Sequence, residues 1–338
     1  MSGLGGSSND DDLATNAISG AAAAHTVAVL GGTGLIGSSI ARAFLDGGHE
    51  VVVLARHDVD VRRAPLLEGA TLVLGDAREP STLERVLEGV GHVVSALAAP
   101  HPAESAKDPL AQFEAELPVL LDLLERVAAR RGIGFTFLSS GGAIYGDVEE
   151  LPVNEEAECH PVSPYGVTKL AAERYVLMAA TRREVPVRIL RVANAIGASQ
   201  THKTGQGVIA ALLHGAQTGT AVRLFGDGSS VRDYVDVADI ATAAVTLSSL
   251  DQPALVVNVG SGVGYRLDAV VQLVEDVTGE VIKIEQAPLR PTDVRAITLD
   301  VSRLRGLMEW HPRALRKSVE DSWAQWCAWR DDARSVTP

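Results

Sequence analysis

The segment Val27-Ala-Val-Leu-Gly-Gly-Thr-Gly-Leu-Ile-Gly37 decides the fold of this chain. An apolar run passes directly into glycines spaced three residues apart, and this order predicts a buried strand, a tight turn and a helix start. Glycines let the backbone approach a pyrophosphate, and the first helical turn offers it free N–H groups. The segment therefore favours a dinucleotide phosphate loop over a turn that serves packing alone. The predicted cofactor contacts are Gly31, Gly34, Leu35, Ile36 and Gly37.

Further apolar runs repeat at intervals along the chain, namely Val51–Leu54, Leu72–Leu74, Val93–Leu97, Phe135–Leu138 and Val187–Leu190. Helix-forming stretches separate them, and this alternation predicts a parallel sheet covered by helices on both faces. We therefore expect an α/β fold of the Rossmann type, a doubly wound parallel sheet, over residues 25–193. The run Val256–Val259 is predicted to return to this sheet, within returning segments near residues 231–260.

The two ends of the chain differ from this pattern. Residues 1–24 are mostly Gly, Ser, Asp and Ala, and such a composition predicts a disordered leader. Beyond residue 193, helical segments alternate with loops rich in Gly, Pro and Arg. We expect residues 194–330 to form mainly a smaller, discontinuous C-terminal lobe that binds the substrate.

The composition excludes several classes of partner and site. A net charge of −13 over 338 residues argues against a nucleic-acid partner, because neutralising phosphates requires clustered Lys and Arg. The only cysteines, Cys159 and Cys327, lie far apart, so neither a disulfide framework nor a metal site is expected. No Lys or Arg precedes Arg42, and no apolar run reaches the roughly 18 residues that a membrane helix needs. We expect a cytoplasmic protein without a membrane partner.

The residues after the second predicted strand bear on the choice between NAD(H) and NADP(H). An acidic residue there would bind the adenosine ribose, whereas an arginine accommodates a 2′-phosphate. The chain has Ala55 followed by Arg56, which favours NADP(H), although Asp58 or Asp60 could still serve the ribose. The other residues assigned to the cofactor are Asp76, at the adenine edge or as a plain helix-preceding cap, Ala77 and Leu97.

A tyrosine and a lysine four residues apart, Tyr165 and Lys169, share one face of a predicted helix that follows Ser163-Pro. A phenol is a poor base at neutral pH, but an ammonium about 4 Å away would lower its pKa by roughly three units. The pair could then exchange a proton with a hydroxyl or carbonyl group. This spacing alone is a weak pattern; its distance downstream of the glycine loop strengthens it.

At this point the chain resembles the extended short-chain dehydrogenase/reductases, and in particular the nucleotide-sugar epimerase/dehydratase family typified by UDP-galactose 4-epimerase. The resemblance covers about Val27 to Pro312 and rests on the glycine loop, the Tyr165/Lys169 pair and the segments Phe137–Gly146, Leu190–Gly197, Gly226–Asp239, Arg290–Asp293 and Trp310–Pro312. It implies that a nucleotide-diphosphate sugar is the substrate and that Lys169 also contacts the cofactor. A homodimer packed through the helices of Tyr165 and of residues 108–131 is implied as well.

The same resemblance implies four substrate-binding residues, Asn194, Arg232, Arg290 and Asp293. Two arginines can grip a diphosphate with charge-assisted, forked hydrogen bonds. Without the resemblance, Arg232 and Arg290 would be interpreted as surface partners of Asp233 and Asp293, because exposed ion pairs are common and weak.

The chain departs from the family at one catalytic position. The family's Ser or Thr that contacts the sugar C4 oxygen lies four residues before the Tyr of its Tyr-Gly pair, and Gly141 stands there. Ser139 and Ser140 are the neighbouring hydroxyls, and residue 143 is Ala. Either Ser140 has taken the role or it falls to Tyr165 and water; Ser140 is our assignment for the third catalytic residue.

The reaction stays open at this point. The family pattern favours a UDP-sugar 4-epimerase that moves hydride at C4 of an NDP-hexose through NAD(P). Ala55-Arg56 favours an NADPH-dependent NDP-4-keto-6-deoxyhexose 4-ketoreductase. A 4,6-dehydratase is disfavoured, because Gly142 and Ala143 stand where its extra acid pair is expected. A non-catalytic dinucleotide-binding sensor is a third alternative, against which the retained Tyr165 and Lys169 argue.

Overall fold

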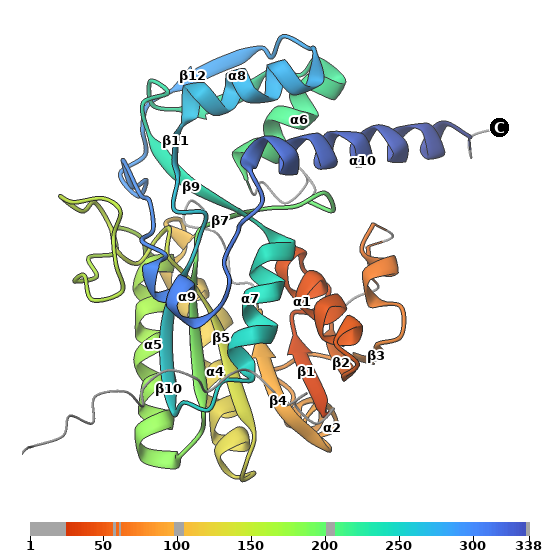
Figure 1. Ribbon diagram of the computed structural model, residues 1–338, viewed down its shortest axis with the longest axis vertical. Coiled ribbons are helices and arrows are strands. Elements are labelled where there is room, and N and C mark those ends of the chain that lie inside the picture. Colours follow the sequence, from red (N-terminus) through yellow and green to blue (C-terminus); the bar gives the residue numbers. More distant parts are fainter. Residues whose placement is uncertain (1–24, 57–58, 61, 98–104, 201–206, 336–338) are drawn as a thin grey trace, which may run out of the picture.

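The computed structural model describes residues 25–56, 59–60, 62–97, 105–200 and 207–335 (Figure 1). The leader predicted for residues 1–24 lies outside the described residues, as does Asp58.

A seven-stranded sheet in which every pairing is parallel forms the centre of the larger lobe. The strand order is β10-β6-β5-β4-β1-β2-β3, so the chain winds outward in both directions from β1. The strands are β1 (Thr26–Leu30), β2 (Glu50–Ala55), β3 (Thr71–Leu74), β4 (Val90–Ser95), β5 (Gly134–Ser140), β6 (Val187–Val192) and β10 (Ala254–Val259). This confirms the predicted doubly wound Rossmann-type fold. The predicted return of Val256–Val259 to the sheet is also confirmed.

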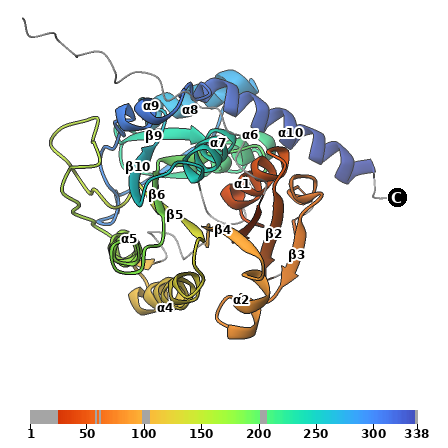
Figure 2. The same cartoon turned by 60° about the horizontal axis from the view of Figure 1, so that its bottom comes forward.

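Helices cover both faces of this sheet (Figure 2). One face packs against α1 (Leu35–Asp46) and α7 (Val237–Ser248), and the other packs against α2 (Pro80–Val86), α4 (Pro109–Ala128) and α5 (Pro164–Arg183). The strands point alternate side chains into these two cores, and for this reason their sequences are almost continuously apolar. Among the described residues between β2 and β3, the one helical element is a short 3-10 helix, η1 (Ala64–Leu67).

A smaller lobe lies above one end of the sheet in Figure 1. It contains a three-stranded and a two-stranded sheet, with a separate apolar core around its helices. Its elements are β7 (Asn194–Ile196), α6 (Val208–Thr218), β8 (Val222–Phe225), β9 (Val231–Asp236), β11 (Gly264–Arg266), α8 (Leu267–Thr278), β12 (Ile284–Ala287) and α10 (Leu315–Ser335). Because β9 leads into α7 and α8 follows β10, the chain passes repeatedly between the lobes; α9 (Ser302–Leu307) contacts β10. The domain boundary after residue 193 stays a prediction, which the start of β7 at Asn194 supports.

No helix in the part of the chain that the structure describes is both long and apolar enough to span a membrane.

Candidate active site

A cavity of about 600 Å³ lies where the carboxyl ends of the central strands meet the smaller lobe. Residues that follow β1 and β4, such as Gly34 and Leu97, line it beside Ser140 at the end of β5. Ligands of doubly wound folds bind at this edge, where the strand order reverses. Of the residues predicted for the site, the cavity is lined by Gly34, Leu35, Ile36, Gly37, Leu97, Ser140, Tyr165, Lys169, Asn194, Arg232, Arg290 and Asp293.

The glycine loop has no space for side chains. Gly31 adopts a φ of +76°, and a Cβ atom there would lie 2.3 Å from the carbonyl oxygen of Ala96. A Cβ atom on Gly37 would lie 2.3 Å from the carbonyl oxygen of Gly31. Gly34 is the N-cap of α1, whose first-turn amides have no acceptor within the helix. This close-packed turn beneath a helix N-terminus fits the pyrophosphate of a dinucleotide, as predicted from the sequence.

Arg63 connects the glycine loop to the segment after β7, a contact that the sequence did not indicate. Its guanidinium donates to the carbonyl oxygen of Thr33 at 3.1 Å and to that of Ser199 at 3.3 Å. Burial lowers the pKa of this guanidinium, and Asp60 opposes the effect. Arg63 thus joins the glycine loop to the segment after β7, and so connects the two lobes beside the cavity.

The residues assigned to the adenosine end lie outside the residues that line the cavity. Arg56 is exposed at the end of β2, whereas Ala77 is buried. Asp76 accepts hydrogen bonds from the backbone and the side chain of Arg78, which lower the pKa of its carboxyl group to about 2. Asp76 does not cap α2, whose N-cap is Glu79, but forms a turn with Arg78; its contact with adenine stays a prediction.

The helix α5 places Tyr165 and Lys169 on one face. Ser163 caps its N-terminus by accepting a hydrogen bond from the amide of Gly166 at 3.1 Å. Lys169 Nζ lies 5.7 Å from the centre of the Tyr165 ring and donates to the carbonyl oxygen of Leu138 at 3.2 Å. The predicted pair is thus assembled inside the cavity.

The electrostatics of the pair differ from the expectation. Burial raises the pKa of Tyr165, and the nearby charge of Lys169 offsets only part of this effect. A second charge, the carboxylate of Glu116 on α4, raises the tyrosine pKa further and lies 2.6 Å from Lys169 Nζ. The prediction that the ammonium lowers the pKa of Tyr165 overall is wrong, because it ignored both burial and Glu116.

The serines of β5 indicate which hydroxyl could replace the Ser or Thr that the family has at the position of Gly141. Ser140 lines the cavity and hydrogen-bonds to Tyr165 at the start of α5, whereas Ser139 donates to Glu173, two turns further along α5, at 2.6 Å. A Cβ atom on Gly141 would lie 2.6 Å from Leu299 Cδ1 and 3.0 Å from the carbonyl oxygen of Arg191. Position 141 has no space for a hydroxyl unless its neighbours move. Both serines line the cavity, but the hydroxyl of Ser139 is engaged by Glu173, so Ser140 is the one whose hydroxyl serves Tyr165.

The residues predicted to bind the substrate lie on the smaller lobe side of the cavity. Asn194 donates to the carbonyl oxygen of Asp233 at 3.0 Å. Arg232 donates to two backbone carbonyls, and burial lowers its pKa against the charges of Tyr234 and Asp293. Arg232 does not pair with Asp233, because that carboxylate is buried and accepts from Ser261. The surface-pair interpretation of Arg232 is therefore wrong.

Arg290 keeps the ion pair that its spacing suggested. It contacts Asp293 through two hydrogen bonds of 2.8 and 2.9 Å, and its guanidinium lies 4.1 Å from the centre of the Phe225 ring. Phe225 and Arg290 both line the cavity. An arginine stacked on an aromatic ring offers a planar apolar surface next to a positive charge. The sequence interpretation missed Phe225, although it directly precedes the Gly226–Asp239 segment.

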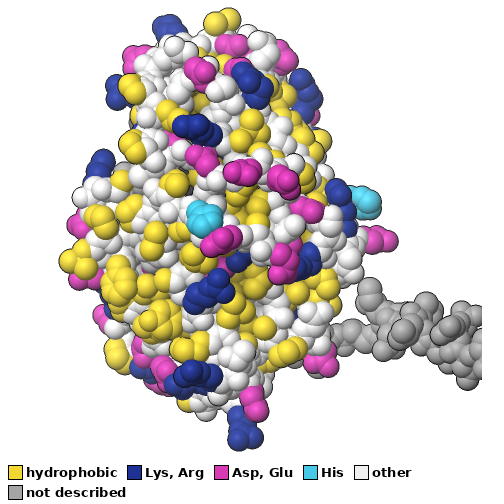
Figure 3. All heavy atoms as spheres, turned by 90° about the vertical axis from the view of Figure 1, so that its left-hand side faces the viewer, with side chains coloured by type: hydrophobic (Ala, Val, Ile, Leu, Met, Phe, Trp, Pro, Cys, Tyr) yellow, Lys and Arg dark blue, Asp and Glu magenta, His cyan; other side chains and the backbone are white. Residues whose placement is uncertain are grey.

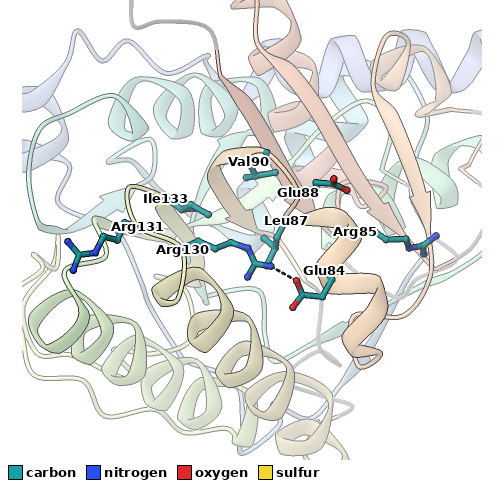
Figure 4. A pocket seen from close by; sticks show the side chains of 9 residues that line it. Glu84, Arg85, Leu87, Glu88, Val90, Arg130, Arg131 and Ile133 are labelled. Atoms are coloured by element: carbon teal, nitrogen blue, oxygen red, sulfur yellow. Dashed lines mark hydrogen bonds and ion pairs between the residues drawn. The ribbon is translucent and has the colours of Figure 1, made fainter.

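A second hollow lies at the opposite edge of the sheet, next to Val90 at the start of β4 and Ile133 before β5 (Figure 4). Its arginine Arg130 points to Glu84 and forms an ion pair with it. It lies at the amino ends of the strands, away from the edge where doubly wound folds bind ligands. No group of His, Cys, Asp and Glu in the described ranges is arranged to hold a metal ion.

Comparisons with known proteins agree with this site. The model of the NAD dependent epimerase/dehydratase family matches residues 27–260. The UDP-glucose 4-epimerase of Lacticaseibacillus casei is 30% identical over 88% of this chain and 96% of its own length. That of Azospirillum brasilense is 32% identical over 86% of this chain and 88% of its own length.

Solved structures give the same result. The Thermotoga maritima UDP-glucose 4-epimerase with UDP-glucose has a TM-score of 0.84 at 29% identity, over 90% of this chain and 99% of that one. The Thermus thermophilus UDP-glucose 4-epimerase in complex with NAD has a TM-score of 0.82 at 29% identity, over 89% and 99%.

Proposed function

Since this chain belongs to the NAD dependent epimerase/dehydratase family, we propose that it is a UDP-sugar 4-epimerase. The observation that supports this most is the content of one cavity. It joins a glycine loop, the Tyr165/Lys169 pair and two arginines of the smaller lobe. The relatives of this chain that are named UDP-glucose 4-epimerase align with it over most of their own length.

The glycine loop and the first turn of α1 would hold the pyrophosphate of NAD, with Gly34, Leu35 and Ile36 facing the cavity. Bound NAD supplies the acceptor and donor of the hydride. Lys169 Nζ forms an ion pair with Glu116 and donates one of its three N–H groups to the carbonyl of Leu138. Because Lys169 also lines the cavity, its ammonium would contact the ligand as well.

Tyr165 would take the proton of the sugar C4 hydroxyl as hydride leaves, and return it when hydride comes back to the other face. Ser140, which hydrogen-bonds to Tyr165, would orient the same oxygen. Arg232 and Arg290 would pair with the diphosphate, and Phe225 would offer a flat apolar surface to the base. Asn194 and Asp293 complete the proposed substrate contacts.

One observation favours a second candidate, the 4-ketoreductase. Ala55 and Arg56 end β2 where an acidic residue would bind the ribose of NAD, and this supports exchangeable NADPH. The NAD-bound relative and the family description support NAD as the cofactor, so the preference for NADP(H) stays a prediction. The sensor alternative lacks a supporting observation, and the position of Tyr165 and Lys169 in the cavity wall supports an enzyme instead.

The experiment follows UDP-glucose and UDP-galactose by chromatography after incubation with the purified protein. We expect interconversion without added reductant, and NAD in the nucleotide released by denaturing the protein. The Tyr165→Phe variant should lose about 10²–10⁴-fold in kcat. Tyr175→Phe, on the exposed side of the same helix, is the matched control. A protein that retains no nucleotide and consumes NADPH with an NDP-4-keto-6-deoxyhexose would instead be the reductase.

We also propose that the protein is a homodimer. Leu110 and Phe113 on α4 and Val167 and Met178 on α5 are exposed apolar side chains. Figure 3, which views the α5 side of the molecule, shows hydrophobic side chains gathered on its lower part. Paired across a two-fold axis, these helices would form an isologous four-helix interface.

Light scattering after size exclusion tests the dimer. Val167→Glu should shift the protein to a monomer, whereas Val281→Glu, at an exposed site of the smaller lobe, should not. A monomeric parent protein would refute this proposal. The cytoplasmic location stays a prediction.

A further inference from the structure

A buried carboxylate from α4 contacts the ammonium group of the pair. Glu116 Oε1 lies 2.6 Å from Lys169 Nζ, and their side chains are only 4% and 5% exposed. A buried charge is costly unless it is paired, so each of these groups depends on the other. Gln112, one turn earlier on α4 and fully buried, donates to the other Glu116 oxygen at 3.4 Å. The carboxylate is therefore held in place from its own helix.

Among the described residues, one more carboxylate, with its own cation, acts on the pair. Glu173, one turn after Lys169 on α5, adds to the field at Lys169 but forms a buried 2.8 Å ion pair with Arg191 of β6. From β5, Ser140 hydrogen-bonds to Tyr165, and Leu138 contributes a backbone carbonyl. The positive charges of Lys169 and Arg191 are thus balanced by two carboxylates, and Glu116 is the carboxylate that neutralises the charge of Lys169.

We propose that Glu116 is a positioning residue of the proposed epimerase: it anchors Lys169 Nζ and holds the Tyr165–Lys169 pair in the form with a neutral phenol and a charged ammonium. This rests on the proposed function only for the activity readout. Tyr165 would accept the proton of the sugar hydroxyl only after it has lost its own, and Glu116 would raise the pH at which that happens. Glu116 on α4 would thus determine the pH at which the Tyr165–Lys169 pair loses its first proton.

The directions of the shifts agree with this role. Burial lowers the pKa of Lys169, but the charge of Glu116 outweighs it with help from Tyr165, and the pKa is raised overall. The pKa of Tyr165 is also raised overall. Burial has the largest effect, Glu116 adds to it, and Lys169 opposes both. Because both groups respond to the same carboxylate, they lose their first shared proton as a coupled pair. Removing the negative charge lowers that first pKa whichever group gives up the proton.

The test compares Glu116→Gln with the parent protein in two measurements. The first is titration of tyrosinate by ultraviolet absorbance in the protein without added substrate, with the matching Tyr165→Phe protein subtracted to isolate Tyr165. The second is the pH dependence of kcat. We expect the titration midpoint and the acid limb of kcat to move to lower pH by about one unit or more.

Three further variants make the result decisive. Glu116→Asn removes the charge with less bulk and must shift both measurements in the same direction, including where Glu116→Gln does not fold. Glu116→Asp keeps the charge and should keep the parent's acid limb while lowering kcat. Glu125→Gln removes an α4 carboxylate that pairs with Arg183 of α5 at the surface, and should change neither measurement.

An unmoved midpoint in the charge-removing variants, or a shift to higher pH, would overturn the role of Glu116. So would an acid limb that Glu116→Asp moves as far as Glu116→Gln does. A parent protein that does not convert UDP-glucose would instead refute the proposed function, and the tyrosinate titration would still decide the question of Glu116.

Discussion

Ser139 and Ser140 are adjacent on β5, and their hydroxyls bind two different residues of α5. Ser139 donates to the buried Glu173 carboxylate at 2.6 Å, while Ser140 faces the cavity and hydrogen-bonds to Tyr165. Ser139 thus supports a buried carboxylate that pairs with Arg191, whereas Ser140 contacts the proposed catalytic tyrosine. The two serines therefore make a matched pair for mutation.

Ser140→Ala should lower kcat by about 10²-fold, because a preorganised hydroxyl beside the reacting oxygen is lost. Ser139→Ala should leave kcat nearly unchanged but lower the free energy of unfolding by about 1–3 kcal/mol, since the buried Glu173 loses a donor. Steady-state kinetics and denaturant unfolding separate the two effects. A larger loss of kcat in Ser139→Ala than in Ser140→Ala would contradict the assignment.

Arg56→Ala should weaken binding of NADPH far more than that of NADH. An exposed arginine at the end of β2 can pair with a 2′-phosphate, a group that NADH lacks. Dissociation constants from nucleotide fluorescence measure the ratio, and Arg42→Ala, on the exposed side of α1, is the control. Equal losses for the two nucleotides would mean that Arg56 does not select the cofactor.

Arg232→Ala should raise the KM for the UDP-sugar, while kcat at saturation falls much less. Its guanidinium lines the cavity from β9 and donates to backbone carbonyls that hold it toward the smaller lobe. Arg266→Ala, which removes an exposed arginine paired with Asp268 in the same lobe, should leave KM unchanged. An unaffected KM in Arg232→Ala would remove this arginine from the diphosphate site.

The fold could be predicted because its determinants are local and periodic. The glycine loop between β1 and α1 needs its spacing whatever the rest of the chain does, and buried parallel strands are apolar throughout. The Tyr165/Lys169 pair was found for the same reason, since residues four apart share a helix face. Arg232 and Arg290 came only from the family resemblance, and their positions around the cavity support it.

What escaped prediction depends on contacts between distant segments. Glu116 has the same sequence surroundings as the exposed Glu114, and only the packing of α4 against α5 makes it buried. The sign of the Tyr165 shift was missed because burial is a tertiary property. Arg63 reaches Thr33 and Ser199 through a loop whose course no periodic pattern encodes.

The last prediction concerns acid stability. His92 is buried on β4, shares a 2.8 Å hydrogen bond with Thr136 and lies near the rings of His25 and His49. Burial, aided by His25, lowers its pKa from 6.5 to about 3. Between these values the unfolded chain binds a proton that the folded protein excludes, so stability rises with pH there. The free energy of unfolding therefore decreases as pH falls from the unfolded pKa of 6.5 toward the folded pKa of about 3.

From pH 7 to about pH 5, this residue alone should remove about 2 kcal/mol from the free energy of unfolding. His92→Gln, which can keep a hydrogen bond to Thr136, should flatten that dependence by a similar amount. His311→Gln, at the surface, should retain the parent's slope. Denaturant unfolding at the two pH values measures all three proteins. Parallel pH slopes in the parent and His92→Gln would show that His92 is not the group excluded from protonation.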